Sequence, residues 1–180
     1  MHILMITGSP HRNGTSALLA DRFMVGATDA GHKIARFDVA FQKVRPCTAC
    51  DACKQNGGHC VLHDDMEVLA PMLKEADVVV LVTPLYYYGM SAQLKAVIDR
   101  FYALGDQLRT GGKKAALMAT CGDGEESAFD ALVAHYRAMC SYLKWRDCGI
   151  VLAPGCYLRA DIENSDYPQL AYELGLGMDR

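Results

Sequence analysis

The sequence predicts an α/β protein, a three-layer sandwich in which helices cover both faces of a five-stranded parallel sheet. Four short apolar runs are separated by amphipathic stretches, and each run is too short to be a buried helix. Continuous apolar runs indicate strands that are buried on both faces, which is typical of parallel sheets. Parallel strands joined by right-handed helical crossovers give the three layers.

The strands are expected in sequence order. The four apolar runs are residues 3–6, 78–82, 115–119 and 149–152. A fifth segment, 34–39, alternates between apolar and polar side chains, as an edge strand does. Because this edge strand is second in sequence, we expect the strand order 2-1-3-4-5, which is the flavodoxin-like order.

Helices are expected between the strands. Apolar side chains recur at helical spacing in segments 19–27, 68–73, 94–104 and 129–143. Asp64 and Glu67 are spaced as in a capping box ahead of the second helix. The tail around residues 168–174 is expected to form a fifth helix. With 180 residues and no linker or repeat, the chain is expected to be one flavodoxin-like domain over residues 1–180, with an irregular cysteine-rich insertion at residues 42–63.

Composition excludes several classes of protein. A hydrophobic fraction of 51% and a charged fraction of 22% argue against disorder. A net charge of −3 without a basic run gives no reason to expect a nucleic acid or membrane partner. The first residues lack a cationic leader, and no stretch approaches the ~20 apolar residues of a membrane span. We therefore expect a cytoplasmic protein whose eight cysteines indicate metal or redox chemistry rather than disulfides.

An anion site is expected where the first strand leads into the first helix. Residues 7–16 form a turn that directs backbone N–H groups and a helix N-terminus at one point. The turn lacks both the P-loop ending and the G-x-G-x-x-G pattern, which disfavours a nucleoside triphosphate. The hydroxyls of Ser9, Thr15 and Ser16 suit a single phosphate monoester. The alternative is a well-capped turn that binds no ligand.

The loop after the third strand, residues 83–91, lies at the same edge of the predicted sheet. Doubly wound sheets bind ligands at this edge, near the point where the strand order reverses. Pro84 and Gly89 bracket a bend, and the tyrosines at 86–88 offer flat faces to a planar ring. Three adjacent tyrosines cannot all face one way, so at least one is expected to be structural or interfacial.

Half of the cysteines form a compact Cys-x2-Cys-x2-Cys-x6-Cys pattern. Three thiolates spaced two residues apart can wrap one face of a cluster, and the glycine pair at 57–58 lets the chain return the fourth. The spacing indicates a metal. An iron–sulfur cluster, a zinc site, a redox thiol pair and inert thiols without metal all stay open from the pattern itself. The four residues are Cys47, Cys50, Cys53 and Cys60.

Three motifs in register resemble the NADPH-dependent FMN reductase family, and within it the iron–sulfur flavoproteins. The first is Gly8-Ser9-Pro10 with Asn13-Gly14, and the second is the cysteine insertion leading into residues 64–66. The third runs from residues 83–86 through 91–95 to 98–100. The likeness covers roughly residues 1–125, and the chain has Asn-Gly-Thr-Ser at 13–16 where the family commonly has Asn-Gly-Asn-Thr.

The resemblance implies a noncovalently bound FMN, NAD(P)H as electron donor and a [4Fe–4S] cluster on the four cysteines. Carried over residue by residue, the phosphate of FMN would be held by Ser9, Arg12, Asn13, Gly14, Thr15 and Ser16. The isoalloxazine ring would be bordered by Pro84, Leu85, Tyr86, Tyr87 and Gly89. The loop after the fourth strand would contribute Thr120, Cys121 and Gly122.

These features predict an FMN-dependent NAD(P)H oxidoreductase with a ping-pong mechanism. NAD(P)H would reduce FMN and leave, and an acceptor would then enter the same slot: a quinone, a nitro or azo compound, a flavin or, through the cluster, a one-electron carrier protein. No catalytic side chain is expected, because the chemistry belongs to the cofactor. A homodimer or homotetramer is expected, since an open slot in so short a chain needs walls. A non-enzymatic electron carrier and a metal-binding module without flavin are the alternatives.

Overall fold

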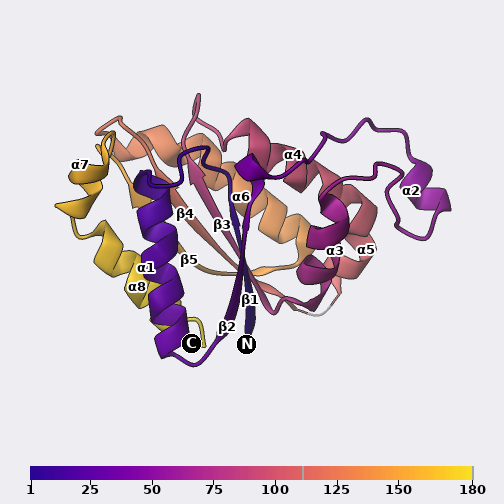
Figure 1. Ribbon diagram of the computed structural model, residues 1–180, viewed down its shortest axis with the longest axis horizontal. Helices are drawn as coiled ribbons and strands as arrows, with labels where there is room; N and C mark the ends of the chain where they lie inside the picture. Colours follow the sequence, from indigo (N-terminus) through magenta and orange to yellow (C-terminus); the bar gives the residue numbers. More distant parts are fainter. Residues whose placement is uncertain (111, 180) are drawn as a thin grey trace.

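The computed structural model describes residues 1–110 and 112–179 and contains one parallel sheet (Figure 1). The order across the sheet is β2-β1-β3-β4-β5, and every neighbouring pair is parallel. The predicted α/β sandwich with strand order 2-1-3-4-5 is therefore confirmed. The strands are β1 (His2–Thr7), β2 (Lys33–Asp38), β3 (Val78–Pro84), β4 (Lys114–Thr120) and β5 (Arg146–Ala153).

Helices pack on both faces of the sheet (Figure 1). One face is covered by α1 (Thr15–Asp29), α7 (Arg159–Glu163) and α8 (Tyr167–Leu176). The other face is covered by α3 (Met66–Glu75), α4 (Ala92–Arg100), α5 (Gly105–Arg109) and α6 (Asp130–Leu143). Helix α2 (Ala52–Gln55) projects from the layers within the cysteine-rich insertion. The 3-10 turns are η1 (Val39–Phe41), η2 (Phe101–Leu104) and η3 (Glu126–Phe129).

Burial on both faces explains the continuous apolar runs. In β1, Leu4 and Ile6 enter the core beneath α3, α4 and α6, whereas Ile3 and Met5 enter the core beneath α1 and α8. The edge strand β2 behaves differently, because Phe37 is its one buried residue. The predicted edge position is therefore confirmed, but burial does not alternate as predicted, because Ala35 on the expected apolar face is exposed. Strand β2 ends at Asp38, one residue before the expected boundary, and η1 follows.

The predicted capping box at α3 is wrong. The Asp64 carboxylate accepts one bond from the Met66 amide at 3.1 Å, but its main partner is the buried Arg100 guanidinium at 2.8 Å. The Glu67 carboxylate does not fold back to the helix start, and instead meets His63 Nδ1 at 2.6 Å. Asp64, which the local spacing predicts to cap the helix, thus binds mainly the buried Arg100.

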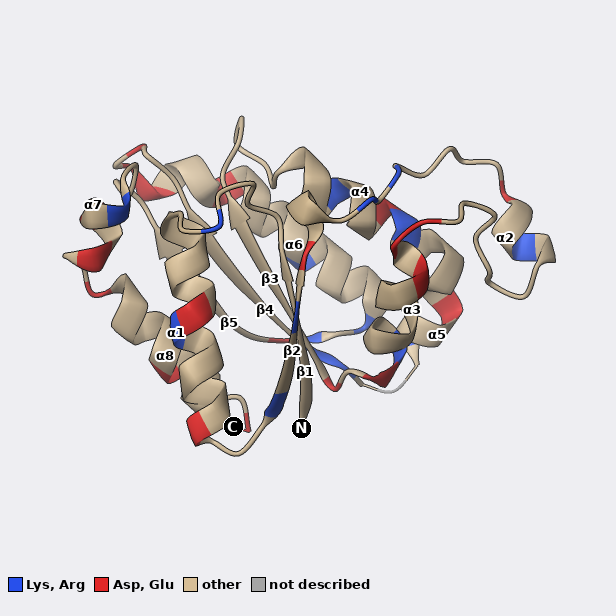
Figure 2. Cartoon of the chain, viewed as in Figure 1, with Lys and Arg blue, Asp and Glu red and all other residues tan. Residues whose placement is uncertain are grey.

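Charged side chains of both signs are interspersed along the helices (Figure 2). An example is Lys95 on α4, whose Nζ lies 2.6 Å from Asp99 Oδ1 one helical turn away. Both side chains are exposed, so the pair contributes only a few tenths of a kcal/mol. Within the described residues, no helix is both long enough and apolar enough to cross a bilayer.

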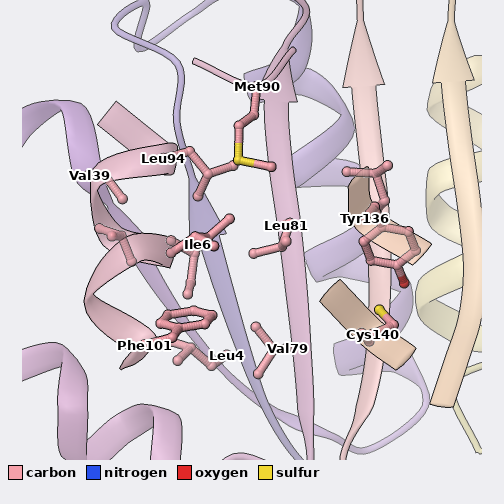
Figure 3. Close-up of a cluster of buried hydrophobic side chains, with 14 of the residues drawn as sticks. Leu4, Ile6, Val39, Val79, Leu81, Met90, Leu94, Phe101, Tyr136 and Cys140 are labelled. Carbon is pink, nitrogen blue, oxygen red and sulfur yellow. The ribbon is translucent and has the colours of Figure 1, made fainter. Parts of the chain in front are cut away.

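Two ionisable side chains lie deep in the core beneath α6 (Figure 3). Tyr136 is fully buried, and its hydroxyl donates to Asp147 Oδ1 at 3.0 Å. One helical turn further on, burial raises the pKa of the Cys140 thiol from its ordinary 9.0 to about 11. Burial also raises the pKa of Tyr136. Both groups are therefore held in their neutral forms.

The free energy of unfolding is expected to fall as pH rises from 9 to 11. In this window the unfolded chain releases the Cys140 proton while the folded chain retains it, so alkali favours the unfolded state by about 1–2 kcal/mol. Urea unfolding at about pH 8 and about pH 10.5 should show a smaller loss in Cys140→Ala than in the parent. The control Cys148→Ala, at a partly exposed thiol, should keep the parent's loss. Equal losses in all three proteins would contradict the assignment.

Candidate cofactor cleft and cysteine pocket

A cleft of about 970 Å³ opens at the carboxyl edge of the sheet. It lies beyond the ends of β1, β3, β4 and β5, where parallel sheets bind ligands. Its size falls within the range of small-molecule sites. We call it the cofactor cleft, and it is lined by residues 9–16, 84–86, 120–122 and 156–159.

One end of the cofactor cleft is built to receive an anion. Helix α1 starts there, its N-cap residue Gly14 supplies no side-chain acceptor, and its first turn contains no acid. The first N–H groups of a helix lack intrahelical partners, so they and the helix dipole favour a negative ligand. The Ser9 hydroxyl accepts a bond from the His11 amide at 3.1 Å, which fixes the turn ahead of the helix.

Side chains from three loops reach this anion end. The Thr15 and Thr120 hydroxyls lie 2.9 Å apart and join the loops after β1 and β4. The Arg12 guanidinium stacks on the Phe41 ring at 3.6 Å, which orders a long cationic side chain at the rim. Nearby Asp38 does not neutralise it, because that carboxylate is paired with Arg36 at 2.8 Å. The charge of Arg12 is therefore available to a ligand.

The loop after β5 also lines the cofactor cleft, and sequence reasoning missed it. Residues 156–159 border the cleft, and Arg159 Nη1 lies 3.4 Å from the Asn13 carbonyl oxygen and 3.3 Å from that of Gly14. A second guanidinium therefore lies across the anion end, and its Nε donates to Glu163 Oε1 at 2.7 Å. The missed signal is simple: β5 ends at the same edge as the other strands, so its loop belongs to the same site.

The opposite end of the cofactor cleft is less polar. Pro84, Leu85 and Tyr86 line it, and the Leu85 amide donates to the Thr120 carbonyl at 2.8 Å, which holds the loops after β3 and β4 together. Cys121 and Gly122 complete this wall. The structure therefore brings together every predicted cofactor-binding residue except two on the neighbouring hairpin.

Those two residues, Tyr87 and Gly89, lie on a tight turn beside the cofactor cleft but not in its lining. Tyr86 and Gly89 exchange backbone hydrogen bonds of 2.9 and 3.1 Å. Between them, Tyr87 and Tyr88 have φ values of 47° and 62°, and Tyr87 is fully exposed. Left-handed backbone costs a residue with a side chain about 1–2 kcal/mol, and such strain clusters at ligand sites.

Close packing anchors the anion loop to α4. A Cβ atom at Gly8 would lie 2.3 Å from Ser91 Oγ and 2.7 Å from Leu94 Cβ, so a side chain has no room there. The Ser91 hydroxyl donates to the Gly8 carbonyl at 2.7 Å and caps α4 by accepting from the Leu94 amide at 3.3 Å. The start of α4 is thereby fixed against the cofactor cleft.

The other end of α4 faces the four cysteines of the insertion. All four line one small cavity of about 20 Å³, which we call the cysteine pocket, together with Arg100 and Tyr102. Cys47 and Cys50 are exposed, Cys53 and Cys60 are partly buried, and all four are free thiols. The predicted metal-ligating residues are thus gathered at one place.

The donors of the cysteine pocket are four sulfur atoms. Within residues 1–110 and 112–179, no three Cys, His, Asp or Glu side chains are grouped closely enough to hold one metal ion. Thiolates around one ion sit at about 2.3 Å from it and crowd together.

The backbone of the insertion is shaped around its sulfurs. Ala49 and Asp51 adopt left-handed φ values of 54° and 57°, which turn the chain between the first three cysteines. The Ala49 amide donates to Cys47 Sγ at 3.4 Å. Hydrogen bonds from the Ala52 amide and then the Thr48 hydroxyl lower the pKa of Cys50. These contacts favour thiolates, the form that ligates metal.

Solved structures of other proteins share the fold over the whole chain. An NAD(P)H:quinone oxidoreductase from Methanothermobacter marburgensis aligns with a TM-score of 0.73 at 16% identity, covering 100% of this chain and 98% of that one. An FMN-dependent NADH-azoreductase from Bacillus anthracis, in complex with FMN, gives 0.73 at 16% identity and covers 100% of both chains. At these identities the likeness concerns the fold.

Sequence relatives are closer. An iron–sulfur flavoprotein of Archaeoglobus fulgidus is 37% identical over 139 residues, 74% of this chain and 70% of that protein. One of Methanocaldococcus jannaschii is 33% identical over 135 residues, 73% of this chain and 69% of that protein. A further Archaeoglobus protein of this description is 31% identical over 131 residues, and the alignment spans 59% of its length. The family model for NADPH-dependent FMN reductase matches residues 1–152, and the chain belongs to that family.

Proposed function

We propose that this protein is an FMN-dependent NAD(P)H oxidoreductase that passes electrons to a small acceptor such as a quinone, a nitro or azo compound or a flavin. The observation that supports this most is the cofactor cleft, which joins an anion-binding end to a less polar end at the carboxyl edge of the sheet. A phosphate attached to a planar ring matches that division. Family membership points to the same cofactor.

The chain's own residues would bind and orient FMN. The open N-terminus of α1, the hydroxyls of the anion loop, and the guanidinium groups of Arg12 and Arg159 would hold the phosphate. The walls at 84–86 and 120–122 would border the ring, with Tyr87 and Gly89 joining from the adjacent hairpin. When bound, FMN supplies hydride acceptance and electron delivery.

We propose that the electron donor and the acceptor use the cofactor cleft in turn, which is a ping-pong mechanism. Tyr86 and Tyr157 line the cleft and are 45% and 80% exposed, so a planar nicotinamide or quinone has aromatic surface to approach. The proposed reaction uses no proton-transferring side chain. In a homodimer or homotetramer, a second subunit would cover the open side of the cofactor cleft.

We further propose that Cys47, Cys50, Cys53 and Cys60 hold a [4Fe–4S] cluster that hands electrons to a one-electron carrier protein. Their common pocket, the bonds that favour thiolates and the iron–sulfur flavoprotein relatives support this assignment. Eight free thiols also suit the reducing cytoplasm.

Anaerobic purification tests both parts separately. We expect FMN to bind with quenching of its fluorescence, NADH or NADPH to be oxidised when a quinone is added, and iron and sulfide to accompany the chain. FMN binding without NAD(P)H oxidation by any small acceptor would favour the non-enzymatic electron carrier. Protein that rejects FMN at saturating excess would contradict the proposal entirely.

Arg159→Gln is expected to weaken FMN binding about five- to tenfold while leaving riboflavin binding unchanged. A charge-assisted bond to phosphate is stronger than a neutral one, and the partial exposure of Arg159 and its ion pair with Glu163 moderate the loss. Titration of FMN fluorescence at low and high salt measures the effect, which salt should diminish. Arg22→Gln is the control, because Arg22 on α1 stacks on Tyr172 rather than lining the cleft. Equal weakening of FMN and riboflavin would contradict a phosphate contact.

A further inference from the structure

Arg100, the last residue of α4, fastens both flanks of the cysteine insertion to the core. Its side chain is 2% exposed. Nη1 donates to the Arg45 carbonyl at 2.9 Å and to Asp64 Oδ2 at 2.8 Å. Nη2 donates to the Leu62 carbonyl at 3.3 Å and to Asp64 Oδ1 at 3.3 Å. One guanidinium therefore holds the chain before the first cysteine and after the last.

The fifth donor of this guanidinium is left over. An arginine carries five N–H donors, and four of them are used by the carbonyls and Asp64. The Nε–H is buried and has no hydrogen-bond partner among the described residues. A buried donor without a partner costs about 1–3 kcal/mol, so native structures seldom leave one. Arg100 and Cys60 both line the cysteine pocket. Against the effect of burial, Asp64 and then Cys60 raise the pKa of Arg100.

We propose that Arg100 is a positioning residue for the cysteine pocket: it clamps the insertion at both flanks and donates its remaining Nε–H to the Cys60 sulfur when that sulfur ligates the cluster. The inference rests on the cluster proposed above and adds a residue outside the ligand set. Hydrogen bonds from outer residues to ligating sulfurs orient the ligands and tune the metal.

The positive charge of Arg100 is expected to change the midpoint potential of the cluster in one direction. Adding an electron to a thiolate-ligated cluster adds negative charge, and a buried cation beside Cys60 stabilises that charge more than an exposed one does. Removal of Arg100 should therefore make reduction harder and shift the midpoint potential to more negative values. A residue that only holds the fold together would loosen the insertion without this directed shift.

The test compares the full-length protein with Arg100→Gln and Arg100→Lys. Hydrogen exchange of the metal-free chain should be about tenfold faster over residues 42–63 in Arg100→Gln, with the sheet unchanged. After anaerobic reconstitution, this variant should retain about tenfold less iron under chelator challenge, and its remaining cluster should have a more negative potential. Arg100→Lys keeps the positive charge but lacks the planar set of guanidinium donors. It should therefore loosen the insertion, while the midpoint potential shifts less than in Arg100→Gln.

Lys43→Gln is the control, because Lys43 is a cation at the same flank with an exposed side chain, whereas the Arg45 side chain itself reaches Asp64 and the His63 carbonyl. It should leave the exchange rates and the potential near those of the parent. If Arg100→Gln does not fold because Asp64 is left unpaired, Arg100→Gln/Asp64→Asn removes the stranded charge and takes its place. If the parent and the variants all bind iron and have equal midpoint potentials and equal hydrogen-exchange rates, the inference about Arg100 is overturned and the cluster proposal stands. A parent that takes up no iron overturns the cluster and this inference together, whereas FMN binding, measured separately, decides the oxidoreductase proposal.

Discussion

Gly175→Ala is expected to destabilise the protein by about 2–3 kcal/mol, although alanine is the better helix former by about 1 kcal/mol. A Cβ at Gly175 on α8 would lie 2.3 Å from the Phe23 carbonyl oxygen on α1. A Cβ at Gly26 on α1 would lie 2.0 Å from the Tyr172 carbonyl oxygen on α8. Both obstacles are backbone atoms, so the helices themselves must separate. Figure 1 shows α1 and α8 side by side.

Gly105→Ala is the control for this prediction. Gly105 starts α5 with helical φ and ψ of −49° and −48°, and nothing lies within 4 Å of its ideal Cβ. Alanine there should stabilise the chain by about 0.5–1 kcal/mol. Urea unfolding of the three proteins measures both signs. A gain in stability at Gly175 as well as at Gly105 would show that α1 and α8 separate at no cost.

The α1–α8 contact also bears on the cofactor cleft. Helix α1 presents its N-terminus to the anion end, and its fully buried Phe23 side chain belongs to the core on that face of the sheet. When Gly175→Ala displaces α1, FMN affinity should fall together with stability. The site therefore depends on a glycine at the far end of the chain that touches no ligand.

Sequence patterns predicted the sheet well because its physics is local to each strand. A strand buried on both faces must be apolar throughout, and β3 is buried from Val78 to Thr83. A strand at the edge is covered less, and Phe37 is the one buried residue of β2. The order of strands then followed from which one alternates. The same rule places the cofactor cleft at the carboxyl edge.

The errors come from partners that are distant in sequence. Asp64 has the spacing of a capping residue, but Arg100, 36 positions away, binds its carboxylate. Nothing in the local pattern carries that information. The short helices α2, α5 and α7 span at most five residues, too few for a visible period. The place of Arg159 could have been predicted, because the strand β5 was predicted and the loop after it must lie beside the loops after β1, β3 and β4.

The largest functional effect is expected from Cys53→Ser, which should abolish the iron of the reconstituted protein. Iron and sulfide should drop from about four of each per chain to less than about one, because a serine hydroxyl is a poor ligand for a thiolate-bound cluster. Reduction of a one-electron acceptor protein should fall in parallel. Cys148→Ser, at a partly exposed thiol on β5, should keep the parent's iron.

Separation of the two sites predicts what Cys53→Ser leaves intact. The start of α4 touches the anion loop through Ser91, its last residue lines the cysteine pocket, and nine residues of helix span about 14 Å. FMN content and NAD(P)H oxidation by a two-electron quinone should therefore stay within about twofold of the parent. Loss of FMN along with iron would mean that the insertion supports the cofactor cleft directly. If the parent holds zinc instead of iron, the four cysteines are still its ligands. Zinc has no redox chemistry, so no electrons would pass to a carrier protein and quinone reduction would be the whole activity.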